Sequence, residues 1–169
     1  MPRSRRWAWY FGVLALLGAI AVTAPLVVNL RAQLTPEKLE EAEARWRERG
    51  PSDYDLHFQE RVGSGLGPVE RHLVVVRGGK VVRVSRLEGD KEVPEEDLPS
   101  SEVQAYGVAG LFRRIGRHLD EDRQAGARNY ATAAFDPKTG CPLRYVRLVR
   151  ASRERLEWVV ELLPPRHPR

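Results

Sequence analysis

The chain has 169 residues, with 28 Lys and Arg against 23 Asp and Glu, and its formal net charge at pH 7 is +5. Six of the basic residues lie outside the region that can form a folded domain: Arg3, Arg5, Arg6, Arg31, Arg166 and Arg169. Without them the charge is nearly balanced, which does not indicate the basic stripe of a nucleic-acid-binding domain, so we expect no nucleic-acid partner.

The N-terminal region carries the strongest single signal in the sequence. Trp7 to Leu30 is an uncharged, mostly apolar run of 24 residues. At roughly 1.5 Å per residue, a helix of that length reaches about 36 Å, enough to cross a hydrocarbon core of roughly 30 Å. We therefore predict a transmembrane signal anchor over residues 7–30, with the lipid bilayer as its partner.

The charges that flank this run predict its orientation. Residues 1–6 form a basic segment, and the positive-inside bias keeps such segments in the cytoplasm. We expect a single-pass protein of the inner (cytoplasmic) membrane, with a cytoplasmic N-terminus and an extracytoplasmic C-terminal domain. The residues expected at the membrane interface are Arg5, Arg6, Trp7, Trp9 and Tyr10.

A cleaved secretory signal peptide is the alternative interpretation of the same run. Ala19-Ile20-Ala21 supplies a small-x-small cleavage site, and Val22-Thr23-Ala24 supplies a second one just before Pro25. The apolar run continues to Leu30, which is longer than the central region of a signal peptide. This length favours an uncleaved anchor.

Residues 31–163 are enough for one domain, followed by a basic tail at 164–169. Thr35-Pro36-Glu37 predicts a helix start, with an N-cap, a proline in the first helical position and an acid in the first turn. This helix should end at Arg49, before Gly50-Pro51. Its apolar stripe consists of Leu39, Ala42 and Trp46.

A strand and a hairpin are predicted next. Tyr54, Leu56 and Phe58 alternate with polar residues, which is typical of a half-buried strand. Residues 73–77 and 80–84 are rich in valine and flank Gly78-Gly79, which predicts a two-residue turn. In that register Val75 pairs with Val82, and Leu73 pairs with Val84.

The middle of the chain predicts a loop and then a helix. Residues 88–104 are acidic, contain Pro94 and Pro99, and show no periodicity, so we expect a long loop that is itself a candidate contact surface. An amphipathic helix should follow, with an apolar face formed by Val108, Leu111, Phe112, Ile115 and Leu119.

The last third predicts three more strands. Residues 130–135 precede the turn Asp136-Pro137-Lys138-Thr139-Gly140, and residues 143–150 and 154–163 should form a hairpin. Pairing Arg150 with Glu154 places Val146 opposite Trp158 and makes a core row of Leu156, Trp158, Val160 and Leu162. The other face is our candidate partner surface, and it carries Tyr145, Arg147, Val149 and Val159.

These elements define the predicted fold class. It is α+β: an N-terminal transmembrane helix, then one domain with an antiparallel sheet of about six strands and two helices on one face. The order is helix, three strands, helix, three strands. Tight turns between successive strands require antiparallel pairing.

The sequence shows no recognisable catalytic, metal or cofactor site. His57, His72, His118 and His167 are scattered, without the spacing of a metal site. His118 precedes acidic residues and could belong to an acid/base cluster, but its position near a helix end favours a structural role. Cys141 is the only cysteine, so no intramolecular disulfide can form, and we expect an inert thiol. We therefore predict a non-enzymatic protein without metal or cofactor.

Four segments resemble a known family. They are Trp46 followed by Asp53-Tyr54, then Val74-x-Val76-x-x-Gly79-Lys80-Val81-x-x-Val84, Val108-x-x-Leu111-Phe112-x-x-Ile115 and Phe135-Asp136-x-x-x-Gly140-x-Pro142. The pattern resembles the bacterial envelope-associated domain of unknown function 6174 family, over Leu39 to about Leu163. Members often carry a cysteine pair, which this chain lacks. The resemblance implies a fold and an envelope location, and it implies no enzymatic activity.

Together these features predict a membrane-anchored extracytoplasmic domain that binds another protein or an envelope component without catalysis. Three alternatives remain open at this point. The domain could be a structural or assembly subunit of a membrane complex, a secreted domain released by signal cleavage, or, least favoured, an enzyme with an unrecognised site.

Overall fold

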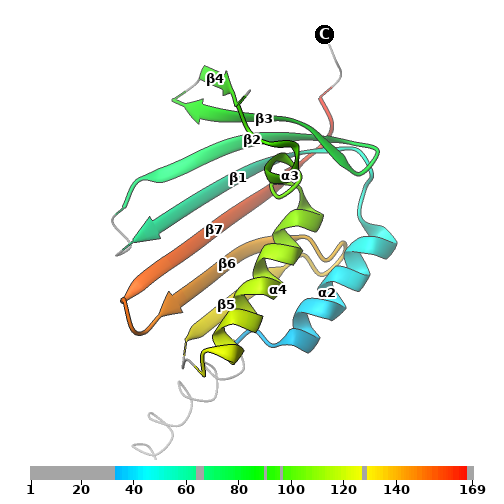
Figure 1. Cartoon of the computed structure of the whole chain (residues 1–169). Coiled ribbons are helices and arrows are strands. Elements are labelled where there is room, and N and C mark those ends of the chain that lie inside the picture. The colour runs from blue at the N-terminus through cyan, green and yellow to red at the C-terminus, as the bar shows by residue number, and fades with distance from the viewer. Residues whose placement is uncertain (1–32, 64–66, 90, 96, 127–128, 167–169) are drawn as a thin grey trace, which may run out of the picture. The chain divides into compact units, whose positions relative to one another are not determined.

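The computed structural model describes residues 33–166 except 64–66, 90, 96 and 127–128 (Figure 1). The helices are α2 (Pro36–Arg49), α3 (Ser100–Val103) and α4 (Val108–Gln124). The strands are β1 (Tyr54–Gly63), β2 (Val69–Arg77), β3 (Lys80–Glu88), β4 (Lys91–Pro94), β5 (Tyr130–Phe135), β6 (Pro142–Val149) and β7 (Glu154–Leu163). Within the described ranges they form one seven-stranded antiparallel sheet in the order β4-β3-β2-β1-β7-β6-β5.

The transmembrane helix of the predicted fold class has no counterpart among the described residues. The predicted anchor, residues 7–30, and its interface residues Arg5, Arg6, Trp7, Trp9 and Tyr10 lie outside the described residues. Among the residues that are described, no helix is long and apolar enough to cross a membrane. The longest of these, α4, has 17 residues and a polar face, whereas a spanning helix needs about 20 apolar residues. This finding conflicts with the predicted single-pass topology and inner-membrane location.

Helix α2 begins and docks as its sequence predicts. The N–H of Lys38 donates to Oγ1 of Thr35 at 3.4 Å, and the stripe of Leu39, Ala42 and Trp46 is buried. Gly140, in the β5–β6 turn, lies directly against this helix with φ +82°. A Cβ on Gly140 would come within 2.2 Å of the Ala42 carbonyl oxygen, so glycine permits this close approach.

The β2–β3 hairpin has the predicted turn and a different register beyond it. Gly78 and Gly79 both have positive φ, and Arg77 pairs with Lys80 as a two-residue turn requires. Between Val75 and Val76 the register shifts, so that Val75 pairs with Arg83 and Val74 with Val84. The predicted pairs, Val75 with Val82 and Leu73 with Val84, are therefore wrong. A β-bulge cannot be read from the alternation of valines on either side of it.

The segment 88–104 contains two elements in place of the single loop we expected. Strand β4 pairs with β3 and adds a seventh strand to the predicted six. Helix α3 follows, and Gln104 at its end holds it on the sheet through two hydrogen bonds with the Val81 backbone, of 3.1 and 2.9 Å. Within the described residues, the element order is therefore one helix, four strands, two helices and three strands.

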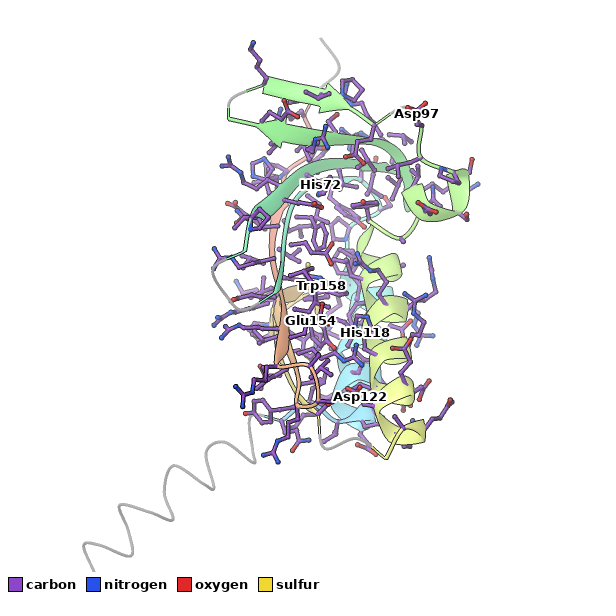
Figure 2. All side chains as sticks on the ribbon, turned by 60° about the vertical axis from the view of Figure 1, so that its left-hand side comes forward. His72, Asp97, His118, Asp122, Glu154 and Trp158 are labelled. Carbon is purple, nitrogen blue, oxygen red and sulfur yellow. The ribbon has the colours of Figure 1, made fainter. Side chains whose placement is uncertain are left out.

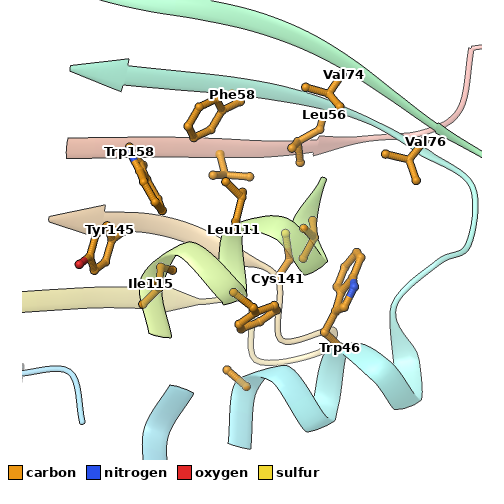
Figure 3. Close-up of a cluster of buried hydrophobic side chains, with 14 of the residues drawn as sticks. Trp46, Leu56, Phe58, Val74, Val76, Leu111, Ile115, Cys141, Tyr145 and Trp158 are labelled. Atoms are coloured by element: carbon orange, nitrogen blue, oxygen red, sulfur yellow. The ribbon is translucent and has the colours of Figure 1, made fainter. Parts of the chain in front are cut away.

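Helix α4 covers the core. Val108, Leu111, Phe112 and Ile115 are buried in it, as the periodicity predicts. Its first turn has no side-chain cap from a neighbouring residue, and the N–H of Val108 donates instead to the Tyr54 hydroxyl at 3.1 Å. Figure 3 shows side chains of α4, α2 and the sheet meeting in this core, among them Trp46, Leu111 and Trp158.

The β6–β7 hairpin is shifted by one residue from the predicted register. Val149 pairs with Glu154, and Tyr145 rather than Val146 pairs with Trp158. The turn has four residues, 150–153, with Arg153 at φ +56°. Because side chains alternate along a strand, this shift exchanges the two faces of β6 relative to β7. The core row on β7 is nevertheless as predicted, with Trp158 and Val160 buried and Leu156 and Leu162 packed against the core.

Candidate binding surface on the open face of the sheet

The described helices all lie on one side of the sheet. Figure 2 shows the sheet nearly edge-on, with the helices on its right and no described helix on its left. We call the helix-covered side the packed face and the other side the open face. Strand pairing assigns each side chain to a face, because directly paired residues in an antiparallel sheet point the same way.

Arginine side chains gather on the open face from four adjacent strands. Gln59 pairs with both Arg71 and Val159, and Val159 pairs with Arg144, so these residues form one row across β2, β1, β7 and β6. The next row, one step along the strands, runs from Val69 through Arg61 to Glu157 and Val146. The row after that contains Arg155 and Leu148. The cluster of Arg61, Arg71, Arg144 and Arg155 is what we call the arginine surface.

Apolar side chains lie exposed among these arginines. Val159 is 41% exposed, Leu148 39% and Val69 38%. A shallow pocket of about 100 Å³ lies between Arg61, Val69, Glu157 and Val159. The surface therefore offers apolar contact between cationic groups, rather than a uniform layer of charge.

Glu157 lies within the arginine surface. Its Oε1 accepts a hydrogen bond from Nε of Arg144 at 3.0 Å, and its Oε2 accepts one from Nη2 of Arg155, also at 3.0 Å. The hydrogen bond from Arg144, followed by the charges of both arginines, lowers the pKa of Glu157. The Glu157 side chain is 15% exposed, whereas those of Arg144 and Arg155 are 55% and 40% exposed.

The sequence-predicted partner surface is only partly recovered. Val159 does lie on the open face, but Tyr145 is 1% exposed and faces the core opposite Trp158. Arg147 and Val149 share the packed face with Tyr145, because they alternate with it along β6. The four residues therefore do not form one surface. The one-residue shift replaces three of them by Arg144, Val146 and Leu148, which a search over both hairpin registers could have found.

Arg147 is part of an ion pair on the packed face. Its Nε donates to Oδ2 of Asp122 at 3.1 Å, and its Nη2 donates to the other carboxylate oxygen. Asn129 donates to the same carboxylate at 2.7 Å, and these hydrogen bonds lower the pKa of Asp122 against the effect of burial. The pair links the end of α4 to β6.

His118 lies beside this pair and does not have the properties of a general acid at neutral pH. Its Nδ1 is 3.3 Å from the hydroxyl of Tyr145, and its ring stacks on Tyr145 with 5.9 Å between centroids. Burial, followed by the charges of Arg147, Arg114 and Arg117, lowers the pKa of His118 to about 4. At neutral pH His118 is therefore an uncharged packing residue.

A second polar link joins the middle of α4 to the sheet. Glu60 accepts hydrogen bonds from Arg114 at 3.0 Å and from Nε1 of Trp158 at 2.9 Å. The Arg114 guanidinium lies 4.3 Å from the Trp158 ring centroid, which is a cation–π distance. These polar groups find their partners within the domain, so their contacts hold α4 on the sheet.

The remaining candidates for chemistry are equally enclosed. Cys141 is 1% exposed, and burial raises the pKa of its thiol to about 12, which disfavours the nucleophilic thiolate. Among the described residues, no group of three His, Cys, Asp or Glu side chains could hold a metal ion.

The C-terminal segment covers the part of the open face that lies away from the arginine surface. Residues 164–166, the C-terminal strap, run from β7 behind β1, β2 and β3 in Figure 1. The backbone N–H of Arg166 donates to Asp55 at 3.2 Å, and its guanidinium donates to Glu92 of β4 at 2.9 Å. Asp55 is fully buried and also accepts from Arg77 at 2.8 Å. The arginine surface begins where this covered part of the sheet ends.

Comparison of the chain with family models, with curated proteins and with solved structures finds no match. The family resemblance drawn from the four sequence segments therefore stays a prediction.

Proposed function

We propose that this domain is a non-catalytic binding module that holds an acidic, partly apolar segment of a protein partner on its open face. The observation that carries the proposal is the arginine surface, in which cationic side chains from four adjacent strands surround the exposed Val159. Arginine is enriched at protein interfaces and binds carboxylates through paired hydrogen bonds.

Surface composition favours a protein over a nucleic acid. Sheets that bind single-stranded nucleic acids present aromatic side chains on which bases stack. In the arginine surface the exposed apolar groups are aliphatic, namely Val69, Leu148 and Val159. Aliphatic side chains suit apolar residues of a peptide.

A binding role also agrees with the state of the titratable groups. His118, whose pKa is lowered to about 4, is a weak base, and burial keeps Cys141 as the poorly nucleophilic thiol. The arginine surface itself offers guanidinium groups, which donate hydrogen bonds to anions.

The direct test is binding of a fluorescent peptide to the full chain, measured by anisotropy at low salt. The probe is a twelve-residue peptide in which Glu alternates with Leu or Val, and the control peptide has Lys in place of Glu. We expect Arg71→Gln/Arg144→Gln to weaken binding of the acidic probe about tenfold, at roughly 0.5–1 kcal/mol for each exposed arginine.

The matched control removes the same charge from the other side of the domain. Arg113 and Arg117 lie exposed on α4, so Arg113→Gln/Arg117→Gln should change binding less than about twofold. Equal weakening by the two double variants would show that the probe is attracted by net charge alone, and it would refute the proposal that the arginine surface is the binding site. Tighter binding of a single-stranded oligonucleotide than of the acidic probe would instead identify a nucleic-acid site.

A further inference from the structure

Glu157 already accepts hydrogen bonds from the guanidinium groups that an acidic partner would bind. Its two carboxylate oxygens accept from arginines of different strands, Arg144 on β6 and Arg155 on β7. A carboxylate supplied by a partner would form the same kind of contact with the same guanidinium groups. Glu157 is thus chemically equivalent to the ligand of the proposed function, on which this inference rests.

The exposure of the three side chains shows what an exchange would cost. Both arginines are exposed enough to turn toward a partner, at 55% and 40%, but Glu157 is only 15% exposed. If one partner carboxylate took over both arginines, Glu157 would remain partly desolvated without its counter-charges. A half-buried carboxylate without a partner is unfavourable, so the exchange of one carboxylate for another gives little net gain.

Further carboxylates change this balance because other arginines lie within the same surface. Arg71 stands in the row of Arg144, separated from it by Gln59 and Val159. Three strand spacings of roughly 4.8 Å separate β2 from β6, which is about 14 Å and matches four residues of an extended peptide. A segment with several acids can therefore reach Arg71 and Arg144 together, whereas a segment with one acid cannot.

We infer that Glu157 is a specificity-determining residue, which competes for the arginine surface and restricts it to partner segments that carry several carboxylates. A singly acidic segment gains too little from displacing Glu157 to bind. A multiply acidic segment gains contacts that Glu157 does not already make.

The test compares two probes on the full chain: the alternating Glu peptide and a version in which all but one Glu is replaced by Gln. Glu157→Gln should tighten binding of the single-Glu peptide about tenfold and that of the multi-Glu peptide clearly less, so the preference for the multi-Glu peptide falls. The matched control is Glu161→Gln, which removes the same charge from the same strand and face, where Glu161 lies 3.6 Å from His57. It should change both affinities less than about twofold.

A preference for the multi-Glu peptide that is unchanged by Glu157→Gln, or changed equally by Glu161→Gln, would overturn the inference. Failure of the wild-type chain to bind the multi-Glu peptide would instead refute the proposed function. A measurement on the wild-type chain guards against a folding defect in the variant. The NMR signal of the Arg144 Nε–H should shift at saturation with the multi-Glu peptide, and a signal that does not move would also overturn the inference.

Discussion

At the scale of single residues, burial decides the charge state of His118. Its pKa is about 4 in the folded chain and near 6.5 when exposed. Between these pH values the unfolded chain binds the proton and the folded chain does not. The contribution of uncharged His118 to stability is therefore fully present above pH 6.5 and decreases as the pH drops toward 4. Asp122 and Glu157, whose pKa values are lowered, lose their contribution only below their ordinary values near 4.

We therefore predict a loss of roughly 1–2 kcal/mol between pH 7 and 4.5 that depends on His118, after allowance for its partial exposure. Urea unfolding of the wild type and of His118→Gln at both pH values measures it. The variant should be less stable than the wild type at pH 7 and should lose less stability on acidification. An equal loss in both chains would show that other groups carry the pH dependence.

A second residue-scale prediction concerns Gly140. Its φ of +82° is unfavourable for alanine, and an added Cβ would meet the Ala42 carbonyl oxygen at 2.2 Å. Gly140→Ala should lower the free energy of unfolding by about 2–4 kcal/mol, from backbone strain and the displacement of α2. Thermal and urea unfolding test this value. A change below about 0.5 kcal/mol would mean that α2 does not approach this turn so closely.

At the scale of elements, Gly116 in α4 makes a useful contrast. An added Cβ would lie 3.7 Å from Leu39 Cδ2, an ordinary contact, and Gly116 is inside a helix where alanine is the better residue. Gly116→Ala should raise stability by about 0.5–1 kcal/mol. Urea unfolding of this variant and of Gly140→Ala in parallel measures the two changes in the free energy of unfolding, which should have opposite signs. Destabilisation by Gly116→Ala would contradict the described spacing of α2 and α4.

The C-terminal strap predicts unequal roles for two arginines that contact Asp55. Arg77 donates to this fully buried carboxylate at 2.8 Å, whereas the Arg166 side chain is 3.8 Å away and 55% exposed. Arg77→Ala should cost about 2–4 kcal/mol, because a buried carboxylate loses its main counter-charge, and Arg166→Ala should cost less than about 1 kcal/mol. Equal costs in urea unfolding would show that the strap, rather than Arg77, neutralises Asp55.

Elements with long periodic patterns could be predicted from sequence, and their pairing could not. The stripes of α2 and α4 and the alternation in β1 are as predicted, since each depends on burial of one face. The registers of both hairpins differ from prediction by one residue beyond a bulge or a longer turn, because valine-rich strands offer apolar side chains in either register. Strand β4 was missed since it is short, charged and ends in Pro94, and its pairing is set by β3 rather than by its own pattern.

The same limitation explains the candidate surface. Exposed residues on β6 follow from its register with β7, so a shift of one residue selects Arg144 and Leu148 in place of Tyr145 and Arg147. The arginine surface also draws on β1, which lies beside β7, and on β2, which lies beside β1, and both positions follow from the sheet order. Sequence separation of about 70 to 100 residues hides such neighbours from any local pattern.

At the scale of the whole described domain, one hydrophobic core joins both long helices to the sheet. The cluster includes Trp46 of α2, Leu111 of α4 and Trp158 of β7. Trp46 contacts Tyr54 edge-on with 5.4 Å between centroids, while Trp158 packs on Tyr145 and Phe58. Because the helices have few buried contacts outside this core, α2 and the sheet should lose their structure together.

We therefore predict a single cooperative unfolding transition. In a chain with Trp7→Phe and Trp9→Phe, fluorescence reports only Trp46 and Trp158, and adding Trp46→Phe or Trp158→Phe isolates each of them. In each single-tryptophan variant, the urea midpoint measured by fluorescence should equal the midpoint measured by far-UV circular dichroism, because both tryptophans lie in one core. An earlier transition for Trp46 than for circular dichroism would show that α2 detaches first, and the close packing of Gly140 against α2 would then not be the contact that holds this helix on the sheet.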